Sequence, residues 1–154
     1  MSSRATLRDL KPLVCSQALS VRTGIVLVTA KSLGAEADEC ARAGLGTVGI
    51  TTWLLDRVEE DATFVDVSPS SVIEVLEQVC ASEGGDRCLG VLGFDLLVAG
   101  LRAAERPQVW RTLRVSFRKR AKALLFFIPS NSKALLPPRQ ELEGWTRDGR
   151  VAYI

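Results

Sequence analysis

Residues 24–30 read Gly-Ile-Val-Leu-Val-Thr-Ala, an uninterrupted run that is rich in β-branched side chains. Such a run predicts a strand that is buried on both faces, as strands inside a parallel sheet are. Further short apolar runs follow it at residues 47–52, 62–67, 88–94 and 123–128. Stretches with helical character lie between most of them, and strands that alternate with helices predict an α/β fold.

The helices are predicted from their start and stop signals. Residues 35–43 contain good helix formers and end at Gly44, while Ser68 and Pro69 supply a cap and a first-turn proline for another helix. We also expect helical structure at residues 53–60, 96–105 and 107–121.

The end of the chain carries a turn signal. Asp148 and Gly149 lie between Trp145 and a short apolar segment at residues 150–154. An Asp-Gly pair is typical of a tight turn between antiparallel strands. We therefore expect residues 145–150 to form a hairpin that closes the edge of the sheet.

The length of the chain, 154 residues, suits one compact domain and is short for two. We expect a single three-layer α/β domain over residues 1–154, with a helical lead-in at residues 1–20 and a mainly parallel sheet of five or six strands. No apolar run approaches the roughly 20 residues of a membrane span, and no signal-peptide pattern follows the basic residues 1–11. We therefore expect a cytoplasmic protein without membrane contact.

The composition excludes several kinds of chemistry. The sequence contains no histidine, which rules out Ser-His-Asp and Cys-His nucleophile systems and every zinc site with a histidine ligand. Cys15, Cys40, Cys80 and Cys88 show no Cys-x-x-Cys spacing. We expect no metal site and four reduced, mostly buried thiols.

The formal net charge of +2 hides a strong segregation of charge along the chain. Residues 34–86 contain twelve acidic and two basic side chains, whereas residues 106–140 contain nine basic side chains and no acidic one. Such blocks can satisfy each other within the fold or present an acidic and a basic face to partners.

The basic block is concentrated on the helix expected at residues 107–121. Its cations fall on one stripe at Arg111, Arg114, Arg118 and Lys122, with Lys119 beside them. Three interpretations remain open: a solvated face opposite the acidic block, a surface that contacts nucleic-acid phosphates, or a surface that binds a protein partner.

Two short motifs resemble parts of a nucleotide site. Lys31 and Ser32 follow the first strand and match the end of the pattern Gly-x-x-x-x-Gly-Lys-Ser/Thr, but Ala30 stands at the second glycine and the loop that would wrap a phosphate is missing. Asp95 directly follows the apolar run at residues 88–94, at the position where a Walker B aspartate would orient Mg²⁺. A helix-capping aspartate gives the same pattern, and no glutamate follows it as a general base.

The order of these parts resembles a reduced RecA-like P-loop core, in which Ser130 or Asn131, after the run at residues 123–128, would stand at the polar sensor position. The size of the chain and the ending Trp145…Asp148-Gly149-Arg150-Val151-Ala152-Tyr153 resemble the small P-loop accessory proteins of BREX-type bacterial phage-defence systems. The resemblance implies a P-loop NTPase-like fold with a degenerate phosphate loop, in which Lys31, Ser32 and Asp95 are vestigial nucleotide-binding positions.

These observations favour a protein that is not an enzyme and has no catalytic residue or bound cofactor. We expect an adaptor or scaffold subunit of an antiphage defence assembly that binds protein subunits, or further copies of itself, through its acidic and basic faces. One alternative is a nucleic-acid-binding module that uses the basic helix at residues 107–122. The other is an atypical ATP-binding protein or ATPase that holds ATP and Mg²⁺ at Lys31, Ser32 and Asp95.

Overall fold

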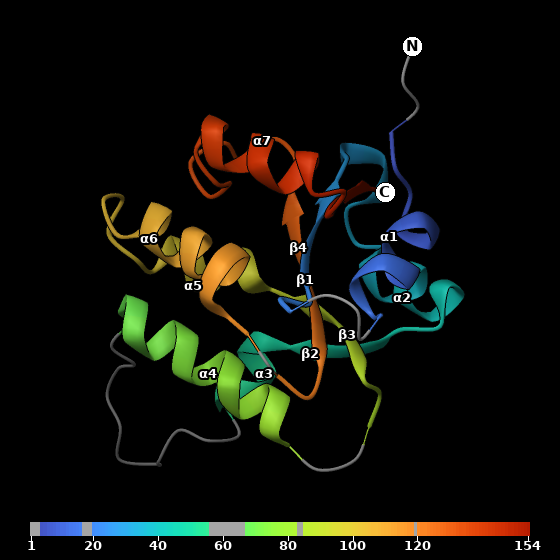
Figure 1. Ribbon diagram of the computed structural model, residues 1–154, viewed down its shortest axis with the longest axis horizontal. Coiled ribbons are helices and arrows are strands. Elements are labelled where there is room, and N and C mark those ends of the chain that lie inside the picture. The colour runs from blue at the N-terminus through green and yellow to red at the C-terminus, as the bar shows by residue number, and fades with distance from the viewer. Residues whose placement is uncertain (1–3, 17–19, 56–66, 83–84, 119) are drawn as a thin grey trace.

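The computed structural model describes residues 4–16, 20–55, 67–82, 85–118 and 120–154 (Figure 1). In these ranges one parallel sheet contains the strands β1 (Thr23–Val28), β2 (Gly46–Gly49), β3 (Cys88–Leu92), β4 (Ala123–Pro129) and β5 (Val151–Tyr153). They lie in the order β2-β3-β4-β1-β5, which confirms the α/β fold with a parallel sheet. Of the predicted strand at residues 62–67, all but Val67 lies outside the described residues.

The first strand is covered on both faces. All six residues of β1 are buried, and the strand pairs with β4 on one side and with β5 on the other. Its side chains alternate between two hydrophobic cores, because Ile25 and Leu27 pack on one face and Val26 and Val28 pack on the other. The environment predicted from residues 24–30 is therefore confirmed.

Helices form a layer on each face of the sheet (Figure 1). One face carries α1 (Leu7–Val14) and α2 (Glu36–Ala43). The other carries α4 (Pro69–Ala81), α5 (Phe94–Ala99), α6 (Arg106–Arg111) and α7 (Arg139–Arg147), and the short helix α3 (Ile50–Leu55) adds Ile50 to the same core. None of the described helices is long and apolar enough to cross a membrane.

Aromatic rings hold the larger helical layer against the sheet. Phe126 of β4 lies with its ring centroid 4.5 Å from that of Phe94 and 6.1 Å from that of Trp110. Trp145 of α7 packs edge-on against Trp110 at 6.2 Å. Both tryptophans are fully buried, so the helices α5, α6 and α7 share one aromatic contact region above β4.

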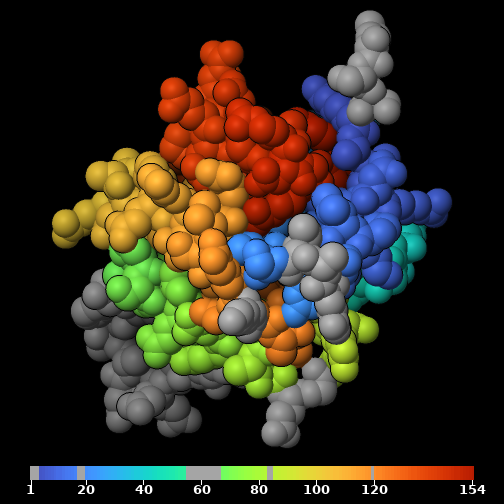
Figure 2. All heavy atoms as spheres, viewed as in Figure 1, coloured from blue at the N-terminus to red at the C-terminus, as the bar shows by residue number. Residues whose placement is uncertain are grey.

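The expected hairpin at residues 145–150 is wrong. Trp145 belongs to α7, and Gly149, with a φ of 72°, follows the end of that helix before β5 pairs in parallel with β1. An Asp-Gly pair also suits a helix end, because glycine there adopts positive φ easily. A strand that pairs in parallel with its neighbour, as β5 does, needs a crossover connection such as a helix before it. Figure 2 shows the C-terminal segment in red packed against both the blue N-terminal segment and the orange segment before β4.

The prediction of one regular helix at residues 107–121 is confirmed only in part, because the helical structure is irregular and ends at Ser116. The helix α6 ends at Arg111 and continues as a π-helical turn, η2 (Thr112–Ser116), before the chain turns toward β4. Two carbonyls of this turn are bound from outside the helix, since Thr23 Oγ1 donates to the Leu113 carbonyl at 2.6 Å and Arg150 Nη1 donates to the Arg114 carbonyl at 3.0 Å. Tertiary hydrogen bonds thus replace a regular continuation, and the predicted stripe of cations does not form.

The cysteines differ in part from expectation. Cys15, at the end of α1, forms a disulfide with Cys88 at the start of β3, so these two are not reduced thiols. Cys40 and Cys80 are free and buried, as expected. The pKa of each free thiol is raised to about 11, mainly by burial, and the neighbouring Glu36 and Glu39 contribute to the rise at Cys40. Both thiols are therefore protonated and unreactive at neutral pH.

Thiol titration with a disulfide reagent checks this arrangement. Without reductant we expect no reaction from the folded protein and two reactive thiols after unfolding, because Cys40 and Cys80 are buried and the other pair is bonded. Reduction should expose four thiols on unfolding and lower the free energy of unfolding by about 2–4 kcal/mol, because the bond closes a long loop. Four thiols in unreduced, unfolded protein would contradict the disulfide.

Candidate functional site

The connections that leave β1 and β4 diverge at the carboxyl edge of the sheet. After β1 the chain passes to α2 on one face, and after β4 it passes to α7 on the other face. The two strands are neighbours, so their outgoing connections separate at this point. In open parallel sheets, ligands bind outside the carboxyl ends of strands where the connections diverge in this way.

A cavity of about 300 Å³ lies at this edge. The apolar part of its lining comes from the ends of the strands and the following loops: Val28, Leu33, Leu92, Gly93, Phe127 and Pro129. Its two ionisable side chains are both carboxylates, Glu36 at the start of α2 and Asp95 at the start of α5. The cavity is thus apolar with an acidic rim, and no basic side chain lines it.

The structure separates the three predicted nucleotide-binding positions. Asp95 lines the carboxyl-edge cavity, behind Gly93, which is the N-cap of α5 with a φ of 78°. Lys31 and Ser32 lie in a short 3-10 turn, η1 (Ala30–Ser32), and neither lines that cavity. Lys31 is exposed to solvent. The carboxyl-edge cavity is therefore lined by Asp95 without Lys31 or Ser32.

Part of the backbone after β1 is hydrogen-bonded within the chain. The N–H of Thr29 donates to the Ile154 carbonyl, that of Ser32 to the Thr29 carbonyl and that of Ala35 to the Ser32 carbonyl, each at 2.9 Å. A phosphate loop instead points successive N–H groups at the ligand. Ser130, at the expected sensor position, donates its N–H to the Val28 carbonyl. Like Lys31 and Ser32, it does not line the carboxyl-edge cavity.

The basic residues singled out in the sequence are dispersed. Arg114 Nε donates to Glu141 Oε1 at 2.5 Å, and this bond raises the arginine pKa. Lys122 is buried, whereas Arg111 and Arg118 are exposed. Lys119 lies outside the described residues. Arg120 joins the basic block to the acidic block through an ion pair with Glu77 at 2.7 Å.

A different set of cations gathers at the amino edge of the sheet. Arg22, Arg87 and Lys122 each precede a strand, β1, β3 and β4 respectively, and line a concavity of about 720 Å³. Sequence reasoning missed this cluster, because the three residues are far apart in the chain. The only sequence feature that marks the cluster is a basic residue immediately before the first residue of β1, β3 and β4.

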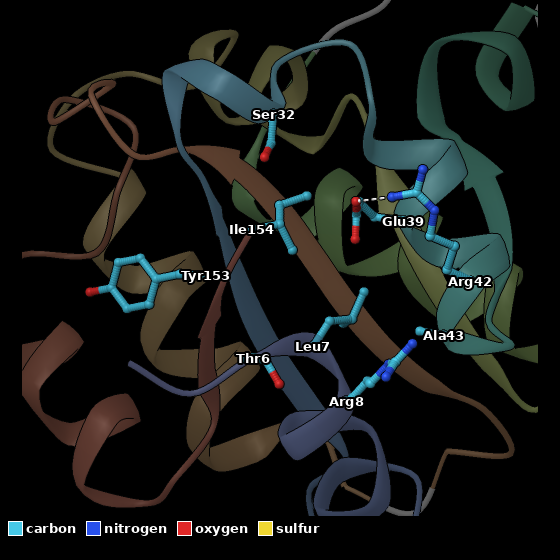
Figure 3. A pocket seen from close by; sticks show the side chains of 9 residues that line it. All are labelled: Thr6, Leu7, Arg8, Ser32, Glu39, Arg42, Ala43, Tyr153 and Ile154. Atoms are coloured by element: carbon cyan, nitrogen blue, oxygen red, sulfur yellow. Dashed lines mark hydrogen bonds and ion pairs between the residues drawn. The ribbon is translucent and has the colours of Figure 1, made fainter. Parts of the chain in front are cut away.

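A second cavity, of about 380 Å³, lies beside η1 between α1, α2 and the end of β5 (Figure 3). The hydroxyl of Ser32 points into it, and Arg8 and Arg42 line it. This cavity was also missed, because its sides come from the two ends of the chain and from α2. No sequence signal marked Arg8 or Tyr153 as neighbours of Ser32.

The chain matches no protein-family model, no curated protein and no solved structure. In the parts of the chain that the structure describes, no three cysteine, aspartate or glutamate side chains gather to hold a metal ion.

Thermal unfolding with nucleotide tests the separation of Lys31 from Asp95. We expect the melting temperature with millimolar Mg-ATP to lie within about 1 °C of that with ATP and EDTA, because no assembled group binds the metal-nucleotide. A bound ligand at 100 times its Kd stabilises by about 2.7 kcal/mol, which is a rise of roughly 5–10 °C for a chain of this size. A magnesium-dependent rise of that size, abolished by Lys31→Ala, would instead identify an atypical nucleotide site.

Proposed function

We propose that this chain is a non-catalytic, P-loop-like adaptor or scaffold subunit of a bacterial antiphage defence assembly and that it binds a protein partner at the carboxyl edge of its sheet. The observation that carries the proposal is a pair of exposed leucines beside the acidic cavity. Leu96 of α5 is 63% exposed, and Leu33, which lines the cavity, is 49% exposed.

Large apolar side chains on a surface are a common feature of binding sites when they lie next to a concave apolar lining. Here the cavity behind the leucines is walled by Val28, Phe127 and Pro129. Of the exposed large apolar side chains in the described ranges, Leu33 lines this cavity and Leu96 directly follows Asp95, which also lines it, whereas Leu13 and Val115 are remote from its lining residues in the sequence. The carboxyl edge therefore combines apolar exposure with a recess that a partner side chain can fill.

The charges at this edge indicate the chemistry of the partner. Glu36 and Asp95 lie on the rim, and no basic side chain lines the recess. Two carboxylates repel a phosphate and attract a cation. A partner that presents an apolar side chain next to lysine or arginine would therefore be complementary in both shape and charge.

The arrangement of the strands supports the P-loop-like part of the proposal. β4, which leads to Ser130, lies between β1, which leads to Lys31, and β3, which is followed by Asp95. Lys31, Asp95 and Ser130 thus follow three neighbouring strands at one edge of the sheet, which is the arrangement that the RecA-like resemblance implies. A fold that retains the carboxyl edge of the sheet without the groups that bind a nucleotide can serve as a binding scaffold.

Binding assays against the proteins encoded by neighbouring genes test the proposal, with light scattering to detect self-association. We expect one such protein to bind, and Leu96→Asp or Leu33→Asp to weaken binding at least tenfold, because each places a charge in the apolar contact. Val115→Asp is the matched control, an exposed apolar side chain on η2, and should bind normally. A monomer that binds none of these proteins, or equal loss in all three variants, would contradict the proposal.

Nucleic-acid binding is a second candidate function, and the amino-edge cations favour it. Arg22, Arg87 and Lys122 line one concavity, and Arg118 lies in the segment leading to β4. Arginine and lysine side chains that contact phosphates position a nucleic acid without reading its sequence. The candidate differs from the original interpretation because the cations come from the starts of three strands instead of one helix.

Fluorescence anisotropy with short DNA and RNA tests this second candidate. It predicts affinity that falls steeply between about 50 and 200 mM salt and falls further in a double variant, Arg87→Glu with Arg118→Glu, because each phosphate contact releases counterions. Both side chains are exposed, so the variant should fold. Arg147→Glu, an exposed arginine at the end of α7, is the control. Absence of binding at low salt would remove this candidate.

A further inference from the structure

The cavity beside η1 has the size of a small-molecule site. Its volume of about 380 Å³ lies at the lower end of the range for ligand pockets. Its sides come from the first turn of α1, from η1, from α2 and from the end of β5 (Figure 3). It lies at the carboxyl edge of the sheet but is lined by different residues from the acidic cavity.

Hydrogen-bond donors face this cavity. Arg8 lines it, and no hydrogen bond or ion pair joins its guanidinium to any residue that the structure describes. The Ser32 hydroxyl points toward the centre of the cavity in Figure 3. Arg42 Nη1 contacts Glu39 Oε1 at 2.7 Å, which leaves other N–H groups of that guanidinium for a ligand.

The side chains that line the cavity carry a net positive charge. Glu39 offsets the charge of Arg42, and no other acidic side chain lines the cavity to offset that of Arg8. Arg4 does not line the cavity, and its guanidinium lies 4.6 Å from the centre of the ring of Tyr153, which does. A planar guanidinium binds carboxylate or phosphate oxygens through parallel hydrogen bonds.

The rest of the lining is apolar. Leu7 of α1, Ala43 of α2 and Ile154 after β5 form its apolar walls, and Figure 3 shows Leu7 and Ile154 between the polar side chains. A ligand that fills the cavity therefore needs an apolar body next to its charged group. We propose that this cavity binds a small anion, a carboxylate or phosphate monoester on an apolar or aromatic body, with Arg8 and Ser32 as the groups that bind its oxygens.

Titration calorimetry and amide chemical shifts with benzoate, phenyl phosphate and neutral benzamide test the proposal. We expect one or both anions to bind and to shift the amide signals of Arg8, Ser32 and Ala43, while benzamide binds at least tenfold more weakly. The two anions distinguish a carboxylate site from a phosphate site. Equal binding of benzamide would show an apolar cavity without anion recognition and overturn the proposal, as would the absence of binding by both anions.

Variants locate the binding groups. Arg8→Gln should weaken binding of the preferred anion at least tenfold, and Ser32→Ala should weaken it several-fold, because each removes a donor that the ligand uses. Arg111→Gln is the control, since Arg111 is an exposed arginine of α6 that does not line the cavity. Unchanged binding in Arg8→Gln, with the fold verified by its amide spectrum, would contradict the proposal. This outcome does not depend on whether a protein binds at the acidic cavity, because the two cavities have different lining residues.

Discussion

The burial of β1 on both faces is the constraint on which the rest of the structure depends. Because every residue of this strand is buried, the sheet needs a helical layer on each side, and the chain supplies α1 and α2 on one side and α4 to α7 on the other.

Arg150 holds β5 against β1. Its Nε donates to the Thr23 carbonyl at 2.7 Å, and its guanidinium lies 4.4 Å from the centre of the Trp145 ring. Burial lowers the arginine pKa to about 10, so it remains charged at neutral pH.

Much of this fold could be predicted from local sequence patterns. Apolar runs predict β1, β3 and β4, and the run at residues 47–52 predicts β2 only in part, because α3 begins at Ile50. Gly44 and the Ser68-Pro69 pair mark a helix end and a helix start that the structure confirms. The failures came where tertiary contacts decided the outcome. Nothing local shows that Thr23 and Arg150 bind the carbonyls of η2, and an Asp-Gly pair looks alike in a hairpin and after a helix.

The candidate sites were less predictable than the fold. Asp95 was identified from its place after an apolar run, and it does line a cavity at the carboxyl edge. Its expected companions Lys31 and Ser32 do not, because η1 turns them toward solvent and toward the neighbouring cavity. The amino-edge cations and the Arg8 cavity combine residues from distant parts of the chain, so only the topology of the sheet could bring them together.

We propose that the carboxyl edge of the sheet is a surface for a protein partner. Amide hydrogen exchange of the chain alone and with a bound partner protein tests this proposal. We expect slower exchange in the partner complex at residues 30–36 and 93–97, around Leu33 and Leu96, with little change at residues 85–87 near the amino edge. Protection confined to the amino edge, with residues 30–36 and 93–97 unchanged, would contradict it.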